Sequence, residues 1–217
     1  MRRLHITDNA MTGSFPQELF KLNELRSLYM SFNSFYGSLP TQISKLTHLE
    51  EFYMFGNMID GSLPGESIAA LTNMREFIMP NNFLSGTIPN VFNRMAKLEQ
   101  LSLYDQKSES LITGTLPHFR NAPKMWYFDI SNNDLTGSIP STFMENSVYL
   151  NEDVTVYLSN NELTGAVPVG LDAFSSLDIL IVGNSITSLP SVLCDHTEWM
   201  QGHVGLVGSC NAVRSKE

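Results

Sequence analysis

Apolar and polar residues alternate over short stretches, and this alternation recurs about every 24 residues. In each instance two apolar residues stand five and three positions before an asparagine, as Leu28 and Met30 stand before Asn33. Alternation of this kind predicts a short strand with one face turned inward. A repeat of this period predicts a solenoid of about eight similar coils. The anchor position is occupied by Asn9, Asn33, Asn57, Asn82, Gln106, Asn133, Asn161 and Asn184.

The second half of the repeat contains the unit Gly-x-apolar-Pro. Glycine permits a tight bend, and proline has a backbone angle suited to the first turn of a helix. A brief helical pattern follows, as in residues 42–49. One coil is therefore expected to be a strand, a turn and a short helical segment. The units are Gly13–Pro16, Gly37–Pro40, Gly61–Pro64, Gly86–Pro89, Gly114–Pro117, Gly137–Pro140 and Gly165–Pro168.

The anchor asparagine is explained by its amide, which both donates and accepts hydrogen bonds. Buried inside a turn, it would pair with backbone groups of adjacent coils that otherwise lack partners. We therefore expect a ladder of asparagines along the solenoid.

The clearest instance of the full pattern is Phe128–Pro140. The pattern Leu-x-x-Leu-x-Leu-x-x-Asn-x-Leu-x-Gly-x-Ile-Pro resembles the plant-type leucine-rich repeat of receptor-kinase ectodomains, polygalacturonase-inhibiting proteins and surface proteins of plants and algae. The resemblance implies an α/β solenoid, a right-handed coil with a parallel concave sheet of about eight short strands and short helical segments on the convex side. It assigns residues 1–193 to the repeat array and 194–217 to a C-terminal cap and tail.

Several segments depart from the pattern. Insertions lie at 105–110 and 144–153. Insertions in solenoids become surface loops and sometimes build binding sites, although simple loop drift is the alternative. The first coil starts within a strand, with Leu4 and Ile6 already at core positions. We interpret it as uncapped, as in a fragment or a chain that lacks its cap and signal peptide.

The two cysteines, Cys194 and Cys210, both lie near the end of the chain. We expect a disulfide that closes the cap. Two free thiols are an alternative. A zinc site with His196 and His203 is another, although the spacing does not match the usual paired ligands.

Composition excludes several classes of function. A chain of 217 residues that is 42% hydrophobic can bury a substantial core. Its net charge of −9, with scattered basic residues, argues against nucleic-acid binding. No apolar stretch approaches the length of a membrane span, so we expect no membrane insertion by this segment.

Residues that alternate with the inward pair point to the concave face. Aromatic and apolar residues gather on its N-terminal half, and exposed aromatics rimmed by polar groups are typical of binding sites. The alternative is that they only stabilise neighbouring strands. Eight strands make a face roughly 34 Å wide, enough for an extended peptide of about ten residues. The expected ligand-binding residues are Tyr29, Tyr53, Phe55, Ile78 and Tyr104.

No nucleophile with a base, carboxylate pair, metal cluster or phosphate loop stands out. We therefore expect a non-catalytic module without a cofactor that binds a protein, a peptide or a glycan. The resemblance implies a cell-surface or secreted protein. An intracellular scaffold is the alternative, because neither a signal peptide nor an Asn-x-Ser/Thr glycan acceptor is present. A fragment of a receptor-like kinase ectodomain is a second alternative.

Overall fold

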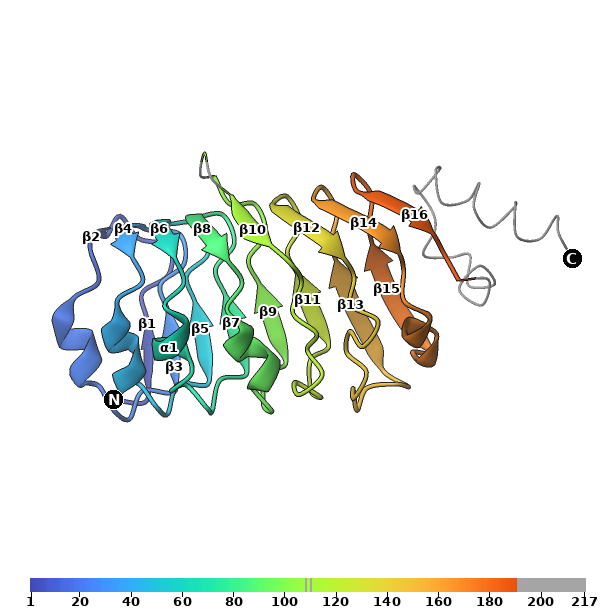
Figure 1. The fold of residues 1–217 in the computed structure, drawn as a ribbon. Coiled ribbons are helices and arrows are strands. Elements are labelled where there is room, and N and C mark those ends of the chain that lie inside the picture. Colours follow the sequence, from blue (N-terminus) through green and yellow to red (C-terminus); the bar gives the residue numbers. More distant parts are fainter. Residues whose placement is uncertain (108, 110, 191–217) are drawn as a thin grey trace, which may run out of the picture.

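The computed structural model describes residues 1–190 except 108 and 110. Over this range the chain forms a row of coils, and each coil contributes one strand to each of two parallel sheets (Figure 1). The α/β solenoid expected from the sequence is confirmed. The expected cap at 194–217, with Cys194 and Cys210, lies outside the described residues.

The first sheet has eight short parallel strands in chain order. Its register aligns equivalent positions of successive coils: Phe52 pairs with Leu28 on one side and Phe77 on the other. The inward side chains therefore stack along the solenoid. The strands are β1 (Arg3–His5), β3 (Ser27–Tyr29), β5 (Glu51–Tyr53), β7 (Glu76–Ile78), β9 (Gln100–Ser102), β11 (Tyr127–Asp129), β13 (Asp153–Tyr157) and β15 (Ser176–Leu180).

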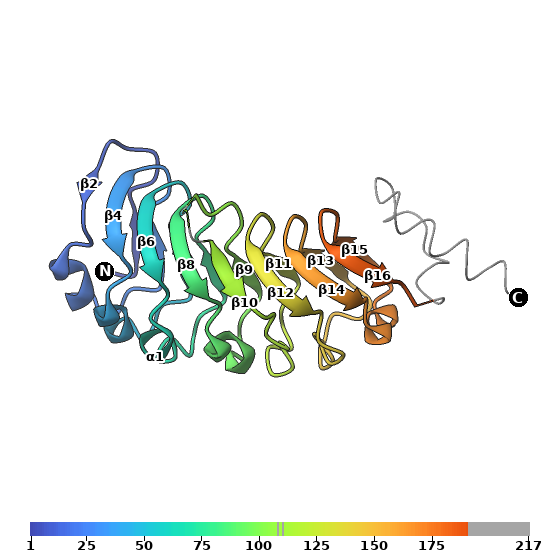
Figure 2. The same cartoon turned by 45° about the horizontal axis from the view of Figure 1, so that its top comes forward.

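A second eight-stranded parallel sheet runs along the side of the solenoid (Figure 2). The sequence predicted only a turn here, because seven of the eight segments contain a glycine. Those glycines take positive φ angles, such as +80° at Gly86. The strands nevertheless pair with their neighbours at and beside the glycines. The strands are β2 (Thr12–Gly13), β4 (Ser34–Ser38), β6 (Met58–Ser62), β8 (Phe83–Thr87), β10 (Ile112–Gly114), β12 (Asp134–Ser138), β14 (Glu162–Ala166) and β16 (Ser185–Ser188).

The expected helical segments follow the prolines, and most are 3₁₀-helices rather than α-helices. Each segment is only four or five residues long, and 3₁₀ geometry suits such short pieces. The segments after Pro117 and Pro140 are exceptions: the first forms no helix, and residues 141–146 form turns. The segments are η1 (Gln17–Lys21), η2 (Thr41–Lys45), α1 (Gly65–Ile68), η3 (Asn90–Arg94) and η4 (Val169–Ala173).

The core is one continuous apolar column inside the coils. Phe52, Phe77 and Phe92 are fully buried, and the ring of Phe77 lies 5.3 Å from that of Phe52 and 5.2 Å from that of Phe92. Phe119 and Phe128 continue the packing farther along, with ring centroids 4.9 Å apart. Each coil thus buries its apolar face only by stacking on its neighbours.

The asparagine ladder, defined as the eight anchor residues, is confirmed from Asn33 onward, whereas Asn9 bonds only within its own coil. The Asn57 amide nitrogen donates to the carbonyl oxygens of Met30 at 3.0 Å and Phe55 at 3.3 Å. Its oxygen accepts from the Phe35 backbone nitrogen at 3.1 Å. Gln106 makes the equivalent set of bonds one methylene farther from its own backbone.

The residue before each anchor takes the left-handed conformation. Glycine, asparagine and aspartate tolerate this region, whereas a bulky side chain there is unusual. Phe32 is the exception in this column, with φ +52°. The members are Asp8, Phe32, Gly56, Asn81, Asp105, Asn132, Asn160 and Gly183.

The described parts of both insertions reach the surface, as expected, although Gln106 and Met144 within them are buried. Lys107 and Glu109 are exposed in the first, and Val148 is exposed in the second. Whether either insertion contributes to binding stays a prediction.

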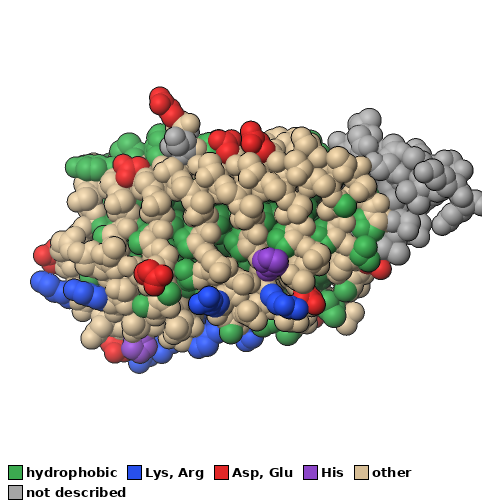
Figure 3. All heavy atoms as spheres, viewed as in Figure 1, with side chains coloured by type: hydrophobic (Ala, Val, Ile, Leu, Met, Phe, Trp, Pro, Cys, Tyr) green, Lys and Arg blue, Asp and Glu red, His purple; other side chains and the backbone are tan. Residues whose placement is uncertain are grey.

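Ion pairs join adjacent coils. Arg75 makes a two-point contact with Glu99, with nitrogen–oxygen distances of 3.0 and 2.7 Å, and Arg26 pairs with Glu50. On the side that carries α1, the visible Lys and Arg side chains lie in the lower half of the view (Figure 3). Exposed ion pairs such as Arg26–Glu50 each contribute about 0–1 kcal/mol to the free energy of unfolding.

Candidate functional site

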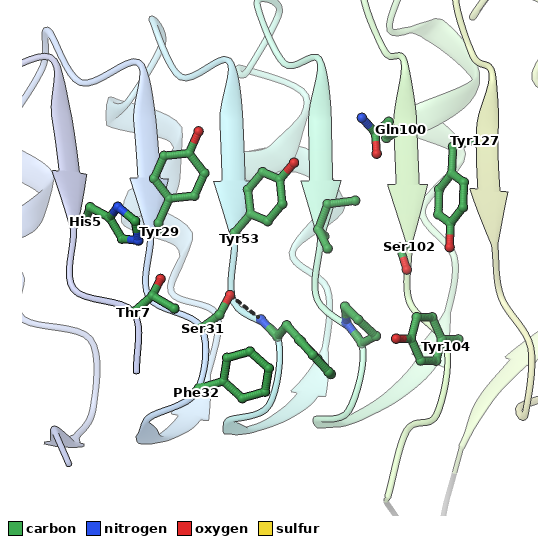
Figure 4. A pocket seen from close by; sticks show the side chains of 13 residues that line it. His5, Thr7, Tyr29, Ser31, Phe32, Tyr53, Gln100, Ser102, Tyr104 and Tyr127 are labelled. Atoms are coloured by element: carbon green, nitrogen blue, oxygen red, sulfur yellow. Dashed lines mark hydrogen bonds between the residues drawn. The ribbon is translucent and has the colours of Figure 1, made fainter. Parts of the chain in front are cut away.

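A groove of about 550 Å³ runs across the first sheet from β1 to β11. Figure 4 shows its side chains in two rows, one with His5, Tyr29 and Tyr53 and one with Thr7 and Ser31. The rows arise because residues two apart on a strand face the same side. The volume is in the range of natural ligand sites.

The rings in the groove contact one another from coil to coil. The Tyr29 ring centroid lies 5.0 Å from that of Tyr53, and the Phe55 ring lies 4.6 Å from that of Phe32. Phe55 also faces Tyr104 at 6.5 Å. The groove therefore offers a continuous aromatic surface over several strands.

Phe32 adds an aromatic at the edge of this surface. It is 51% exposed although its backbone is held in the left-handed region. Strained residues that the surrounding structure holds in place cluster at functional sites. Phe32 is therefore a candidate contact residue.

Tyrosine hydroxyls on the concave face donate to carboxylates of the next strand. This arrangement fixes the rings in place and leaves the carboxylates with a neutral partner. The pairs are Tyr29–Glu51, Tyr53–Glu76 and, with an oxygen–oxygen distance of 2.6 Å, Tyr157–Asp178.

These pairs shift the pKa values of the tyrosines and of Glu51. Burial and the bond to Glu76 raise the pKa of Tyr53, while the bond to Asp178 and burial raise the pKa of Tyr157 to about 12. Burial alone would raise the pKa of Glu51, but hydrogen bonds from Tyr29 and Ser27 and the nearby charge of Arg3 outweigh it and lower that pKa. At neutral pH the tyrosines are hydrogen-bond donors, and Glu51 carries negative charge.

Beside the far end of the groove, Asp129 lies next to Ser102 in the sheet register. One Asp129 carboxylate oxygen accepts from the Ser131 backbone nitrogen at 3.0 Å and hydroxyl at 2.7 Å. The other accepts from the Tyr127 hydroxyl at 3.3 Å. Burial raises the pKa of Asp129.

A second hollow, of about 720 Å³, lies between α1 and η3 and is lined mainly by small or polar residues. Within residues 1–190, leaving aside 108 and 110, no three His, Cys, Asp or Glu side chains are grouped as a metal site. In the same part of the chain, no helix has the length and apolar character needed to cross a membrane.

The leucine-rich repeat family model matches residues 24–46 and 124–146. Among solved structures, the plant peptide hormone receptor RGFR1 in complex with RGF2 is similar over 90% of this chain, with a TM-score of 0.78 and 28% sequence identity. The chain has the leucine-rich repeat fold of these plant receptor ectodomains. Its repeats span 30% of that receptor chain.

Two further leucine-rich repeat structures are receptor ectodomains from Arabidopsis. The HAESA ectodomain, in complex with an N-terminally extended IDA peptide hormone, has a TM-score of 0.77 and 27% identity, covering 89% of this chain and 31% of that one. The GASSHO1/SCHENGEN3 ectodomain of Arabidopsis thaliana, in complex with CASPARIAN STRIP INTEGRITY FACTOR 2, has a TM-score of 0.71 and 28% identity, covering 89% and 25%. No curated protein sequence matches the chain.

In this leucine-rich repeat fold all five expected ligand-binding residues line one groove. Their role in binding stays a prediction. The sequence did not single out Phe32, Ser102 or Asp129. A signal existed for Phe32, which occupies a position where the other coils have Gly, Asn or Asp. The five expected residues are Tyr29, Tyr53, Phe55, Ile78 and Tyr104.

Proposed function

We propose that the chain is a non-catalytic recognition module that binds an extended peptide, or an extended segment of a protein, in the groove of the first sheet. The observation that carries this proposal is the continuous aromatic surface across several parallel strands. Rigid, half-buried aromatics contribute large contact area at low cost in conformational entropy. Solved structures of similar repeats contain peptide ligands, which supports the same ligand class.

The groove suits an extended chain better than a compact small molecule. It crosses successive strands of the first sheet, from β1 to β11, and a peptide lying across them would contact a side chain of each coil in turn. Equivalent residues in successive coils are spaced by about 4.8 Å, so a peptide of about ten residues covers the face.

Residues Tyr53 and Phe55 lie in the middle of this surface and provide the test. A library of random decapeptides displayed on phage is selected against the protein, and a binding peptide is synthesised. Tyr53→Ala and Phe55→Ala should each weaken its affinity at least about tenfold, because central aromatics dominate such interfaces. Tyr36→Ala is the matched control, since Tyr36 is an exposed tyrosine on β4 of the second sheet.

Circular dichroism and urea unfolding show whether each variant keeps the fold. Unchanged affinity in both folded groove variants would move the site elsewhere. A glycan array probed in parallel tests the other expected ligand class, and glycan binding without any peptide binding would overturn the proposal.

We further propose that the chain is a segment of a receptor-like, cell-surface or secreted protein. Its similarity to receptor ectodomains supports this, and so does the fraction of those ectodomains that it spans. Fluorescence localisation of the full-length native protein is the test, and a cytosolic signal would favour the intracellular scaffold.

A further inference from the structure

Ser102 has an unsatisfied hydroxyl at the far end of the groove. The residue is 2% exposed, and its oxygen has no hydrogen-bond partner within the described part of the chain. It nevertheless lines the groove, and Figure 4 shows it in view between Tyr127 and Tyr104. Buried hydroxyls are normally paired, so this one has unused hydrogen-bonding capacity at the wall of the groove.

Asp129, beside Ser102, is a buried carboxylate without a positive partner. It is 6% exposed, and no ion pair among residues 1–190, with 108 and 110 set aside, includes it. Its partners are neutral hydroxyl and amide groups, and the bond from Tyr127 is long at 3.3 Å. A buried charge of this kind is unfavourable until a cation joins it.

The surroundings increase that penalty. The nearby Asp105 carboxylate repels the negative charge of Asp129, and burial favours its neutral form. Tyr104, Tyr127 and Tyr157 also interact with Asp129, and all three are neutral at pH 7. A positively charged group would therefore be attracted to this point.

Tyr104 and Tyr127 give the point aromatic walls. Both rings line the groove, one on each side of Ser102 in the view of Figure 4. Cations bind favourably over tyrosine rings. A guanidinium fits better than an ammonium, because it is planar, stacks on rings and offers several donors in one plane.

We propose that this end of the groove is a subsite for an arginine side chain of the bound peptide, whose guanidinium donates to the Asp129 carboxylate and the Ser102 hydroxyl and stacks against Tyr104 or Tyr127. The subsite rests on the proposed peptide-binding function and specifies its ligand. It predicts that peptides selected by the groove contain arginine.

One charged and two neutral model compounds distinguish binding at the arginine subsite from general binding in the groove. The probes are Nα-acetyl-argininamide and its uncharged analogue Nα-acetyl-citrullinamide, titrated into the full chain and followed by NMR of the Asp129 carboxyl carbon. For comparison, acetyl-leucinamide reports apolar contacts alone. We expect the arginine compound to bind at least about tenfold more tightly than citrulline, because a hydrogen bond to a charged group is stronger than a neutral one. Its binding should also lower the pKa of Asp129.

Variants test the two groups directly. Asp129→Asn should abolish the preference for arginine over citrulline, and Ser102→Ala should weaken arginine binding several-fold without removing the preference. Asp153→Asn is the matched control, because Asp153 is an exposed carboxylate on the neighbouring strand β13. Equal affinity for the two compounds, or an unchanged preference in a folded Asp129→Asn protein, would overturn the subsite.

The selected peptides distinguish this failure from failure of the proposed function. Peptides that depend on Tyr53 and Phe55 but bind equally well after arginine is replaced by citrulline would refute the subsite alone. If the arginine compound binds at Asp129 while no library peptide depends on Tyr53 or Phe55, the subsite stands and the proposed function fails.

Discussion

Asn133 shows how one amide joins two coils. Its nitrogen donates to Leu103 of the preceding coil at 3.2 Å and to Ile130 of its own at 3.1 Å, and its oxygen accepts from the Ile112 nitrogen at 3.2 Å. Asn9 donates only to carbonyls of its own coil. The same residue type therefore has a different stabilising role at the two positions.

Replacing Asn133 with Ala should lower the free energy of unfolding by about 1–3 kcal/mol, because backbone groups of two coils lose their partner. Asn9→Ala should cost less, since Asn9 is exposed and bonds only within its coil. Urea unfolding measures both. Equal losses would show that the cross-coil bonds contribute little.

Asp129 provides a pH-dependent prediction. Its raised pKa means that the folded protein holds this proton more tightly than the unfolded chain does. Asp129 therefore favours the folded state most at low pH, where it is protonated. This contribution to the free energy of unfolding is lost as the pH rises from the ordinary aspartate pKa through the higher pKa of the folded state. Without ligand, Asp129→Asn should be more stable than the parent at neutral pH, and the two should converge below about pH 4.

Unfolding of both proteins in urea across this pH range is the measurement. A variant less stable than the parent at neutral pH would mean that the charged form makes structural bonds worth more than its burial costs. Asp129 alternates with the inward residues Phe128 and Ile130, so the alternation puts it on the concave face. Its burial depends instead on how Ser131, Tyr127 and the neighbouring coils pack, which the sequence of one coil does not specify.

At the level of elements, the second sheet is the main feature that the sequence analysis missed. Its strands contain glycines in the left-handed region, and glycine inside an alternating stretch usually indicates a bend. The repeat brings equivalent glycines side by side, so each irregular strand pairs with a neighbour of the same shape. Single-segment propensity could not show this, because the pairing arises only from repetition.

Gly86 tests the need for glycine in these strands. Its φ is +80°, and an added Cβ would lie 3.1 Å from the Cβ of Ser62. Gly86→Ala should therefore lower stability by about 1–2 kcal/mol. Gly170 in η4 is the control: its φ is not in the left-handed region, the nearest atom would be 3.7 Å away, and Gly170→Ala should be neutral or stabilise by up to about 1 kcal/mol.

Thermal unfolding followed by circular dichroism compares the two glycine variants in the same protein. A Gly86→Ala protein as stable as Gly170→Ala would show that the second sheet adjusts its backbone freely.

For the whole molecule, repetition made the architecture predictable. The period predicted the number of coils, the order of strands in the first sheet and the residues that point into the core, because every coil has the same conformation and packs on its neighbours in the same way. The groove was predictable only in part. Tyr53 and Phe55 followed from alternation, whereas the Tyr53–Glu76 bond and the unpaired Ser102 depend on how side chains of neighbouring coils meet.

The asparagine ladder is built from amides and backbone groups that carry no charge, whereas the groove is edged by carboxylates. Acid and salt act on charges and leave neutral hydrogen bonds nearly unaffected. Acid or salt that releases a positively charged peptide from the groove therefore leaves the asparagine ladder, and with it the folded solenoid, in place. The protein could be immobilised as a capture reagent, emptied by mild acid and reloaded after neutralisation without a refolding step.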